Sequence, residues 1–230
     1  MSSGKILALD CSTEYCSVAL LVDDEHIDRV ERAGQRHSEL LLPMIDAVLG
    51  ERDLALGDLD AIAFGAGPGS FTGLRIACGV AQGLAFGASR RVVAVPTLLA
   101  LAQATAARRV FAILDARMGE VYLAAYDRTA GSWQTVIAPC LCKPDAVPPL
   151  AGGDWFGVGS GFFVHGDKLR QIYARELGDV DAEAYPHARH IATLAHAEWQ
   201  AGRGVPAGDA LPLYIRDKVA FTERERRAAS

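Results

Sequence analysis

The feature that most constrains the fold is an order of elements that occurs twice along the chain. Three apolar, strand-like segments open the sequence between residues 5 and 33, and the first of them ends in Asp10. The same order returns between residues 110 and 142, where the first strand ends in Asp115. Consecutive strands joined by short turns pair as a meander. The repeat therefore predicts two similar α/β lobes, residues 1–104 and 105–230, with a boundary near residues 104–109.

Helices are expected to cover the strands of both lobes, with less regular spacing in the second. The expected helices lie at residues 37–52, 71–88, 97–106, 166–176 and 188–202, and the further strands at 59–67, 92–96 and 152–161. A mixed sheet with helices in each of two lobes is typical of the fold shared by actin, sugar kinases and Hsp70. In that fold a nucleotide lies between the lobes, although a fold alone establishes no activity.

Composition indicates a soluble protein that does not bind nucleic acid by itself. Half of the 230 residues are hydrophobic and 22% are charged, with a formal net charge of −5. Nucleic-acid binding requires clustered Lys and Arg, and the one basic cluster, in the tail, is diluted by Glu223 and Glu225. The five cysteines are loosely spaced among apolar neighbours, which favours a reducing compartment. Without a signal peptide or a long uncharged apolar stretch, the sequence predicts a cytoplasmic protein that does not enter a membrane.

The first hairpin is one candidate binding site. Asp10 ends a strand, and Ser12 and Thr13 lie in the turn that follows. A carboxylate, two hydroxyls and turn amides can together hold a hydrated cation and a phosphate. Alternatively, these side chains only satisfy the backbone of their own turn.

A glycine-rich loop leads into the second helix and is a candidate anion site. Its glycines permit close approach of a ligand to the backbone, and a helix N-terminus attracts anions. The loop lacks the Lys-Ser/Thr pair of a P-loop. Arg75 opposes the helix dipole, so we expect it to meet an anion, either a ligand or a carboxylate of the chain. The candidate nucleotide- or anion-binding residues are Asp10, Ser12, Thr13, Gly67, Gly69, Ser70, Thr72, Gly73 and Arg75.

The same helix carries a stripe of glycines, which suggests a contact with another helix. Gly79, Gly83 and Gly87 are four residues apart and share one face. Each internal glycine costs about 1 kcal/mol relative to alanine, so a use for the thin face is expected. The helix that packs on it belongs either to this chain or to another chain.

The preceding helix has more apolar residues than one buried face requires. They spread over more than one stripe between Leu40 and Leu49, which predicts a second contact with a partner. Ser38 is the expected N-cap, and Pro43 either kinks the helix or marks its true start.

Other constellations indicate neither a metal site nor a complete catalytic set. His187 and His190 lack a glutamate at metalloprotease spacing, and the Cys140–Cys142 pair has no matching His or Cys cluster. The sequence contains no G-x-S-x-G elbow, and no cysteine has an evident histidine partner.

Four stretches of the sequence together resemble the TsaB (YeaZ) family of the bacterial machinery for tRNA threonylcarbamoyladenosine. They are ILALDCSTEYCSVAL, HSELLLPMIDAVL, DLDAIAFGAGPGSFTGLRIACGVAQGLAFG and VVAVPTLLALA. The resemblance covers about the first 125 residues and returns in the tail at LPLYIRDKVA. Ala77 stands where the family usually has glycine.

The resemblance implies a non-catalytic subunit that supports the catalytic paralogue TsaD, together with the ATPase TsaE. That complex modifies the adenosine next to the anticodon in tRNAs that read codons starting with A, from an intermediate made by TsaC-type enzymes. It implies no intrinsic cofactor, but leaves open ATP or ADP with Mg²⁺ at the boundary with TsaD, and tRNA contact only within the complex. The implied interface binds TsaD or a second copy, through His37, Glu39, Leu41, Met44, Ile45, Val48, Ile76, Gly79, Val80, Gly83 and Gly87.

A metallopeptidase and a kinase are the two other functions to which this fold is suited. TsaD-like relatives carry an H-x-x-x-H metal pair where this chain has Thr97 and Leu101, which argues against a metal enzyme and a peptidase. The alternative is an ATP-dependent small-molecule kinase or ATPase of the same fold. It would need a catalytic Asp between the lobes and a second phosphate loop, and the turn after Asp115 lacks the usual glycine run.

Overall fold

The structure is a computed structural model that describes residues 4–216, and its first lobe is built on a mixed five-stranded sheet. The strand order is β3-β2-β1-β4-β5. β1 pairs antiparallel with β2 and parallel with β4, which places its carboxyl end beside the glycine loop. The strands are β1 (Ile6–Asp10), β2 (Tyr15–Val22), β3 (Glu25–Arg32), β4 (Ala61–Gly67) and β5 (Arg91–Pro96). The expected strands of this lobe are confirmed.

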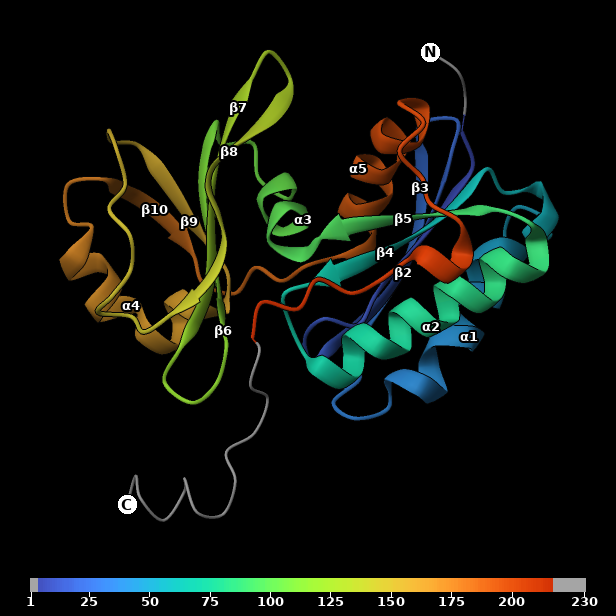
Figure 1. Ribbon diagram of the computed structural model, residues 1–230, viewed down its shortest axis with the longest axis horizontal. Helices are drawn as coiled ribbons and strands as arrows, with labels where there is room; N and C mark the ends of the chain where they lie inside the picture. The colour runs from blue at the N-terminus through green and yellow to red at the C-terminus, as the bar shows by residue number, and fades with distance from the viewer. Residues whose placement is uncertain (1–3, 217–230) are drawn as a thin grey trace.

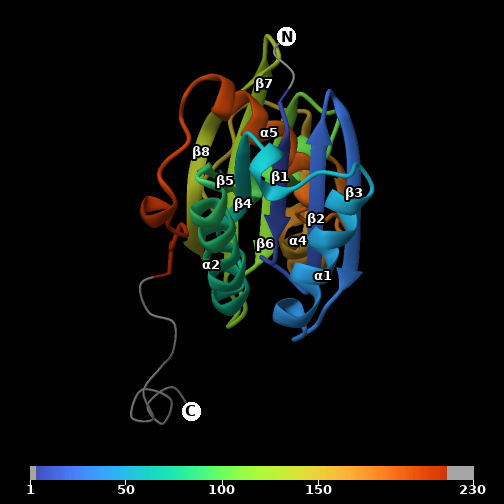
Figure 2. The ribbon, with the colours of Figure 1, turned by 90° about the vertical axis from the view of Figure 1, so that its right-hand side faces the viewer.

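Two helices cover the outer face of this sheet, where α1 (His37–Gly50) and α2 (Phe71–Ala88) lie side by side (Figure 2). Their apolar side chains form one core with Leu7, Leu9 and Phe64 of the strands. α1 begins at His37 after an Arg36 N-cap that makes no side-chain cap bond, so the expected Ser38 cap is wrong. The helix also runs through Pro43, which is therefore not its start.

The inner face of the first sheet is covered by α3 (Thr97–Gln103) and α5 (Ala188–Gln200). α5 buries Ala188, Ile191, Ala192 and Ala195, which the 3.6-residue period places on one side. Small residues of the strands face them, so the helix packs closely on the sheet. α5 thus joins the first lobe although it follows the second sheet in the sequence.

The second lobe has a sheet of order β10-β9-β6-β7-β8. Its strands are β6 (Arg109–Asp115), β7 (Val121–Thr129), β8 (Ser132–Cys142), β9 (Trp155–Val158) and β10 (Leu177–Asp181). The outer face is covered by α4 (Ser160–Ile172), which starts six residues before the expected position. A Cβ at Gly161 would lie 2.3 Å from Ile113, so the glycines of this segment bring a helix onto β6 and do not form the expected turn. Sequence reasoning did not predict β10.

The layers follow one another across the molecule as α1 with α2, the first sheet, α3 with α5, the second sheet, and α4 (Figure 1). This arrangement confirms the two-lobed actin-like fold. The predicted boundary at residues 104–109 corresponds to the segment between α3 and β6 and stays a prediction, since α5 follows it in the sequence and packs on the first sheet. Two short 3-10 helices, η1 (Leu56–Asp58) and η2 (Ala207–Asp209), lie at the first lobe. Within the described part of the chain, none of the helices has the length and apolar character needed to cross a membrane.

The segment that follows α5 runs along the first lobe and then reaches the second. We call residues 204–216 the strap. Val205 pairs with Val92 at the outer edge of β5, and the Leu213 N–H donates to the Ala66 carbonyl at 2.7 Å. At its end the Arg216 guanidinium donates to the Ala116 carbonyl of the second lobe at 3.0 Å. The rest of the expected tail lies outside the described residues.

Candidate functional site

Asp10 lies at the carboxyl end of β1 and is completely buried. Its Oδ1 accepts hydrogen bonds from the Ser12 N–H (3.1 Å) and the Ser12 hydroxyl (2.8 Å). Its Oδ2 has no hydrogen-bond partner among residues 4–216. Burial raises the pKa of Asp10 to about 7 against the lowering effect of both hydrogen bonds, because loss of water disfavours the charged form. Ser12 therefore serves its own turn, while the turn does not account for Oδ2.

The glycines of the loop bring the first hairpin onto the N-terminus of α2. A Cβ at Gly69 would lie 2.4 Å from the Ser12 carbonyl oxygen, and one at Gly73 would lie 1.8 Å from that of Cys11. The Ser70 N–H donates to the Ser12 carbonyl at 2.7 Å. Sequence reasoning assigned this close approach to a ligand, whereas the structure shows that the chain's own turn makes it.

Some of the loop amides donate within the chain. The Gly67 N–H donates to the Thr97 hydroxyl at 2.9 Å, and the Ser70 side chain caps α2 by accepting from the Gly73 N–H at 3.3 Å. Thr13 accepts a hydrogen bond from its own turn, and Thr72 is exposed in the first turn of α2. The nucleotide or anion site stays a prediction, and it would depend mainly on Thr72 and Arg75.

Arg75 contacts aromatic residues where we expected an anion. Its guanidinium stacks over the Phe71 ring at 3.6 Å from the centroid, and its Nε donates to the Tyr214 hydroxyl at 3.0 Å. It makes no ion pair with any residue in the described part of the chain. The interpretation that Arg75 binds a carboxylate of its own chain is therefore wrong for the described residues. The anion that we expect beside Arg75 then belongs to a ligand or to another chain.

The glycine stripe of α2 faces outward. A Cβ placed at Gly79, Gly83 or Gly87 would meet no atom of the described chain within 4 Å. Within residues 4–216, then, no internal helix uses the thin face. Phe86 stands beside the stripe with 82% of its surface exposed, and sequence reasoning missed it. Its position three residues after Gly83 could have indicated that Phe86 lies beside the stripe on the helix surface.

The predicted interface residues divide by burial. Ile76 and Val80 are half-buried, and Glu39 is exposed like the three stripe glycines. The apolar residues of α1 pack mainly on their own sheet, so few apolar side chains of this helix are left for a partner. The most exposed of them is Leu42, with 49% of its surface exposed, and it was not among the predicted interface residues. Five predicted residues lie in the core of this chain: His37, Leu41, Met44, Ile45 and Val48. His37 also donates from Nε2 to the Thr13 carbonyl at 2.9 Å.

The turn after β6 repeats the position of the first hairpin in the second lobe. Asp115 accepts from the Arg117 N–H at 3.1 Å, and its Oδ2 lies 3.4 Å from the Arg117 guanidinium. Its own N–H donates to the Ser160 hydroxyl at the start of α4. Asp115 is thus held by its own turn and by α4, which does not favour a second phosphate loop.

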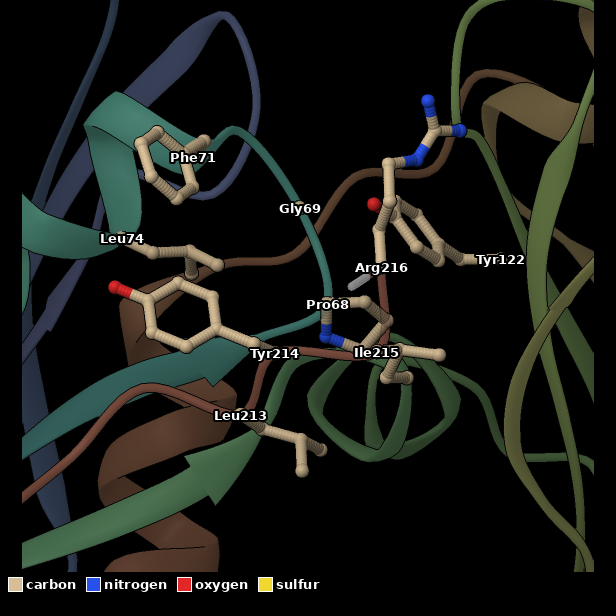
Figure 3. Close-up of a pocket in the computed structure, with 9 residues that line it drawn as sticks. All are labelled: Pro68, Gly69, Phe71, Leu74, Tyr122, Leu213, Tyr214, Ile215 and Arg216. Carbon is tan, nitrogen blue, oxygen red and sulfur yellow. The ribbon is translucent and has the colours of Figure 1, made fainter. Parts of the chain in front are cut away.

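The strap forms a small pocket with the glycine loop and the second lobe (Figure 3). Its volume is about 30 Å³, enough for one or two water molecules. Pro68 and Phe71 line it on one side, Tyr122 on the other, and Tyr214 and Arg216 come from the strap. Local sequence patterns do not predict this position of the tail, because its partners lie 100 or more residues earlier in the chain.

The histidines of α5 lie together near β3 without forming a metal centre. The His187 and His190 rings are 6.2 Å apart, and Arg189 pairs with Asp28. Among the described residues, no three His, Cys, Asp or Glu side chains are placed to bind one metal ion. Thr97 and Leu101 are both buried in α3.

A protein-family model identifies the class of protein to which this fold belongs. The model described as TsaD, tRNA N6-adenosine threonylcarbamoyltransferase, matches residues 30–221. Two relatives match the chain over nearly its whole length. It is 38% identical to the tRNA threonylcarbamoyladenosine biosynthesis protein TsaB of Haemophilus influenzae, over 96% of this chain and 97% of the relative. It is also 38% identical to the TsaB of Escherichia coli, over 94% and 96% of the two chains.

Solved structures agree with the sequence relatives. YeaZ from Pseudomonas aeruginosa is 42% identical and superimposes with a TM-score of 0.86, over 92% of this chain and 99% of that one. The chain belongs to the TsaB (YeaZ) family.

Proposed function

We propose that this chain is a non-catalytic subunit of the complex that forms N6-threonylcarbamoyladenosine in tRNA. It docks on a TsaD-class subunit through the outer face of α1 and α2, and the ATPase TsaE completes the complex in the cytoplasm. Contact with tRNA is made only in the assembled complex, in keeping with the net charge of −5 of this chain. Family membership supports the pathway, and the open stripe of α2 supports the mode of docking.

The single observation that carries the proposal is the empty space above Gly79, Gly83 and Gly87. Each of these glycines costs α2 about 1 kcal/mol relative to alanine. No described part of the chain uses the space that they leave. Helix axes approach to about 8–10 Å according to the side chains at the contact, so a glycine face permits the closest packing. We infer that a helix of a second protein packs into this space.

Replacing Gly83 with leucine tests this docking face. Gly83→Leu is expected to abolish co-purification with a TsaD homologue while circular dichroism shows an intact fold, because the side chain projects into open space. Gly166→Leu, at another open glycine within a helix, is the matched control on α4 and should leave binding unchanged. Retention of the TsaD homologue by Gly83→Leu would contradict the docking face.

A reconstituted tRNA modification assay tests the role. Omission of this chain and its replacement by Gly83→Leu should reduce the modification to the same low level. The isolated chain should not hydrolyse ATP. A metal-dependent ATPase rate that Asp10→Ala abolishes would instead support the kinase alternative.

A further inference from the structure

Two cysteines face each other across the first hairpin, where β1 ends and β2 begins. The strand register pairs Asp10 with Ser17, and one residue further along it sets Cys11 opposite Cys16. Their Sγ atoms are 3.9 Å apart, and both are free thiols. Directly opposed residues of antiparallel strands have Cα atoms about 4.5 or 5.5 Å apart, and both spacings fall within the range that a disulfide spans. The pair is therefore placed to form an intramolecular disulfide.

The other three cysteines of the chain lack this arrangement. Cys78 lies on α2, and its thiol donates to the Ala210 carbonyl of the strap at 3.4 Å. Cys140 and Cys142 are two residues apart on the same strand, β8. A strand advances by about 3.3 Å per residue, so their Cα atoms lie near the upper limit for a disulfide. The first hairpin is thus the place where two cysteines meet across neighbouring strands.

Cys16 is the more acidic thiol of the pair. The hydrogen bond from the Cys11 thiol stabilises a thiolate at Cys16 and lowers its pKa, against the effect of burial. The same contact, together with burial, raises the pKa of Cys11. The thiolate is the reactive form of a cysteine. Cys16 is therefore the nucleophile, and Cys11 is close enough to attack the Cys16 sulfur once that sulfur is oxidised.

The turn between these two cysteines supports the N-terminal ends of α1 and α2. The Ser12 carbonyl accepts from the Ser70 N–H at 2.7 Å, just before α2 begins. The Thr13 carbonyl accepts from Nε2 of His37, the first residue of α1, at 2.9 Å. A disulfide would close this turn covalently and restrict the opening of both contacts.

We propose that Cys11 and Cys16 are a peroxide-sensitive modification site that is oxidised to a reversible disulfide. The Cys16 thiolate attacks one oxygen of hydrogen peroxide, the O–O bond breaks, and hydroxide leaves to become water. The Cys11 sulfur then attacks the sulfenic sulfur of Cys16, and the S–O bond breaks as water leaves with the Cys11 proton. Two thiols and one peroxide thus give one disulfide and two waters, as two electrons pass from sulfur to oxygen. Exchange with a reducing thiol restores the pair.

The burial of both thiols limits the rate of this reaction. Cys11 and Cys16 have no exposed surface, whereas Glu14 in the turn between them is exposed. Peroxide therefore enters during local opening of the hairpin end, which costs less free energy than global unfolding. We expect oxidation to accelerate at urea concentrations below the unfolding transition. Once formed, the disulfide protects Cys16 from irreversible oxidation to the sulfinic acid.

The test is mass spectrometry of the full chain after exposure to hydrogen peroxide and alkylation of the remaining thiols. Cleavage after Lys and Arg leaves both cysteines in one peptide, residues 6–29. We expect this peptide to be lighter by two hydrogens, to carry no alkyl group and to recover both thiols with dithiothreitol. In the oxidised chain, hydrogen exchange should slow several-fold at residues 12–15 and at the starts of α1 and α2.

Variants separate the disulfide from other oxidation. Cys11→Ser should let Cys16 proceed to the sulfinic acid, with a gain of two oxygen atoms, and Cys16→Ser should leave Cys11 unmodified. The double variant Cys140→Ser/Cys142→Ser is the matched control and should form the disulfide as the wild type does. A wild-type peptide that keeps both thiols, even in urea below the unfolding transition, would overturn the proposal. A disulfide between Cys16 and Cys78, or a sulfinic acid at Cys16 in the wild type, would overturn it as well.

Discussion

At the scale of the residue, Asp10 is the position where burial and charge are most clearly opposed. Its carboxyl is fully buried, one oxygen lacks a partner among residues 4–216, and its pKa is raised to about 7. In the unfolded chain the pKa is about 4, so the folded state binds the proton more tightly between these values. The stabilisation is complete below about pH 4 and is lost as the pH rises through about 7. At pH 8 the buried charge therefore opposes folding.

Asp10→Asn is expected to become progressively more stable than the wild type as the pH rises from 5 to 8. The relative gain over this range is on the order of 2–3 kcal/mol, because about two pKa units separate pH 5 from the folded pKa of about 7. Urea unfolding of both proteins across this range measures it, and every other titrating group cancels in the difference. A difference that does not change with pH would show that Asp10 stays charged in the fold.

Residue identity predicted these local roles only in part. The glycines between Gly65 and Gly73 indicated that other atoms lie very close to the backbone of this loop. The structure confirms such close contacts at Gly69 and Gly73. The approaching atoms are carbonyl oxygens of Ser12 and Cys11, more than fifty residues earlier in the sequence. A missing Cβ indicates that something lies close, but spacing along the chain carries no information about which atom it is.

At the scale of the element, the strands and main helices of the first lobe followed from local patterns, whereas the packing of α5 did not. Its apolar period predicted a helix correctly, but a helix with one small-residue face fits either sheet. The N-terminus of α5 is fixed by long-range bonds, since the Ala188 N–H donates to the Ser17 hydroxyl and Arg189 pairs with Asp28. β10 was missed because its short segment, LGDVD, lacks strand-like alternation.

The histidines at this end of α5 make its docking sensitive to acid. Burial, then the nearby charges of His187 and Arg189, lower the pKa of His190 to about 4. The unfolded chain binds this proton near pH 6.5, so the folded state is favoured fully above that pH and loses stability as the pH falls towards 4. His190→Gln should show a shallower loss of unfolding free energy between pH 6.5 and 4.5 than the wild type. Parallel curves in urea titrations would contradict this assignment.

At the scale of the whole molecule, the strap is a second connection between the two lobes, in addition to the packing of α3 on the second sheet. It passes the outer edge of β5, contacts α2 through Ala210 and Tyr214, and ends on the second lobe. The sequence showed only a tail with little periodicity, because a strap in an extended conformation is specified by distant partners and has no repeating pattern of its own. The proposed docking face and the turn after Asp115 are thereby connected through one stretch of chain.

Arg216 is the point at which this connection is expected to fail first. Its side chain is 13% exposed, and it donates to the Ala116 carbonyl (3.0 Å) and to the Glu120 carboxylate (2.6 Å). Arg216→Met leaves both acceptors without this donor, which should cost about 2–3 kcal/mol of unfolding free energy. Arg108→Met is the matched control, because it removes an arginine–carboxylate pair whose arginine is 68% exposed, and such pairs contribute at most about 1 kcal/mol. Hydrogen exchange should also accelerate in Arg216→Met at residues 115–120 and along the strap, whereas β1 to β4 should keep their protection. Equal losses of stability in the two variants, with unchanged exchange in the strap, would mean that the lobes hold together without it.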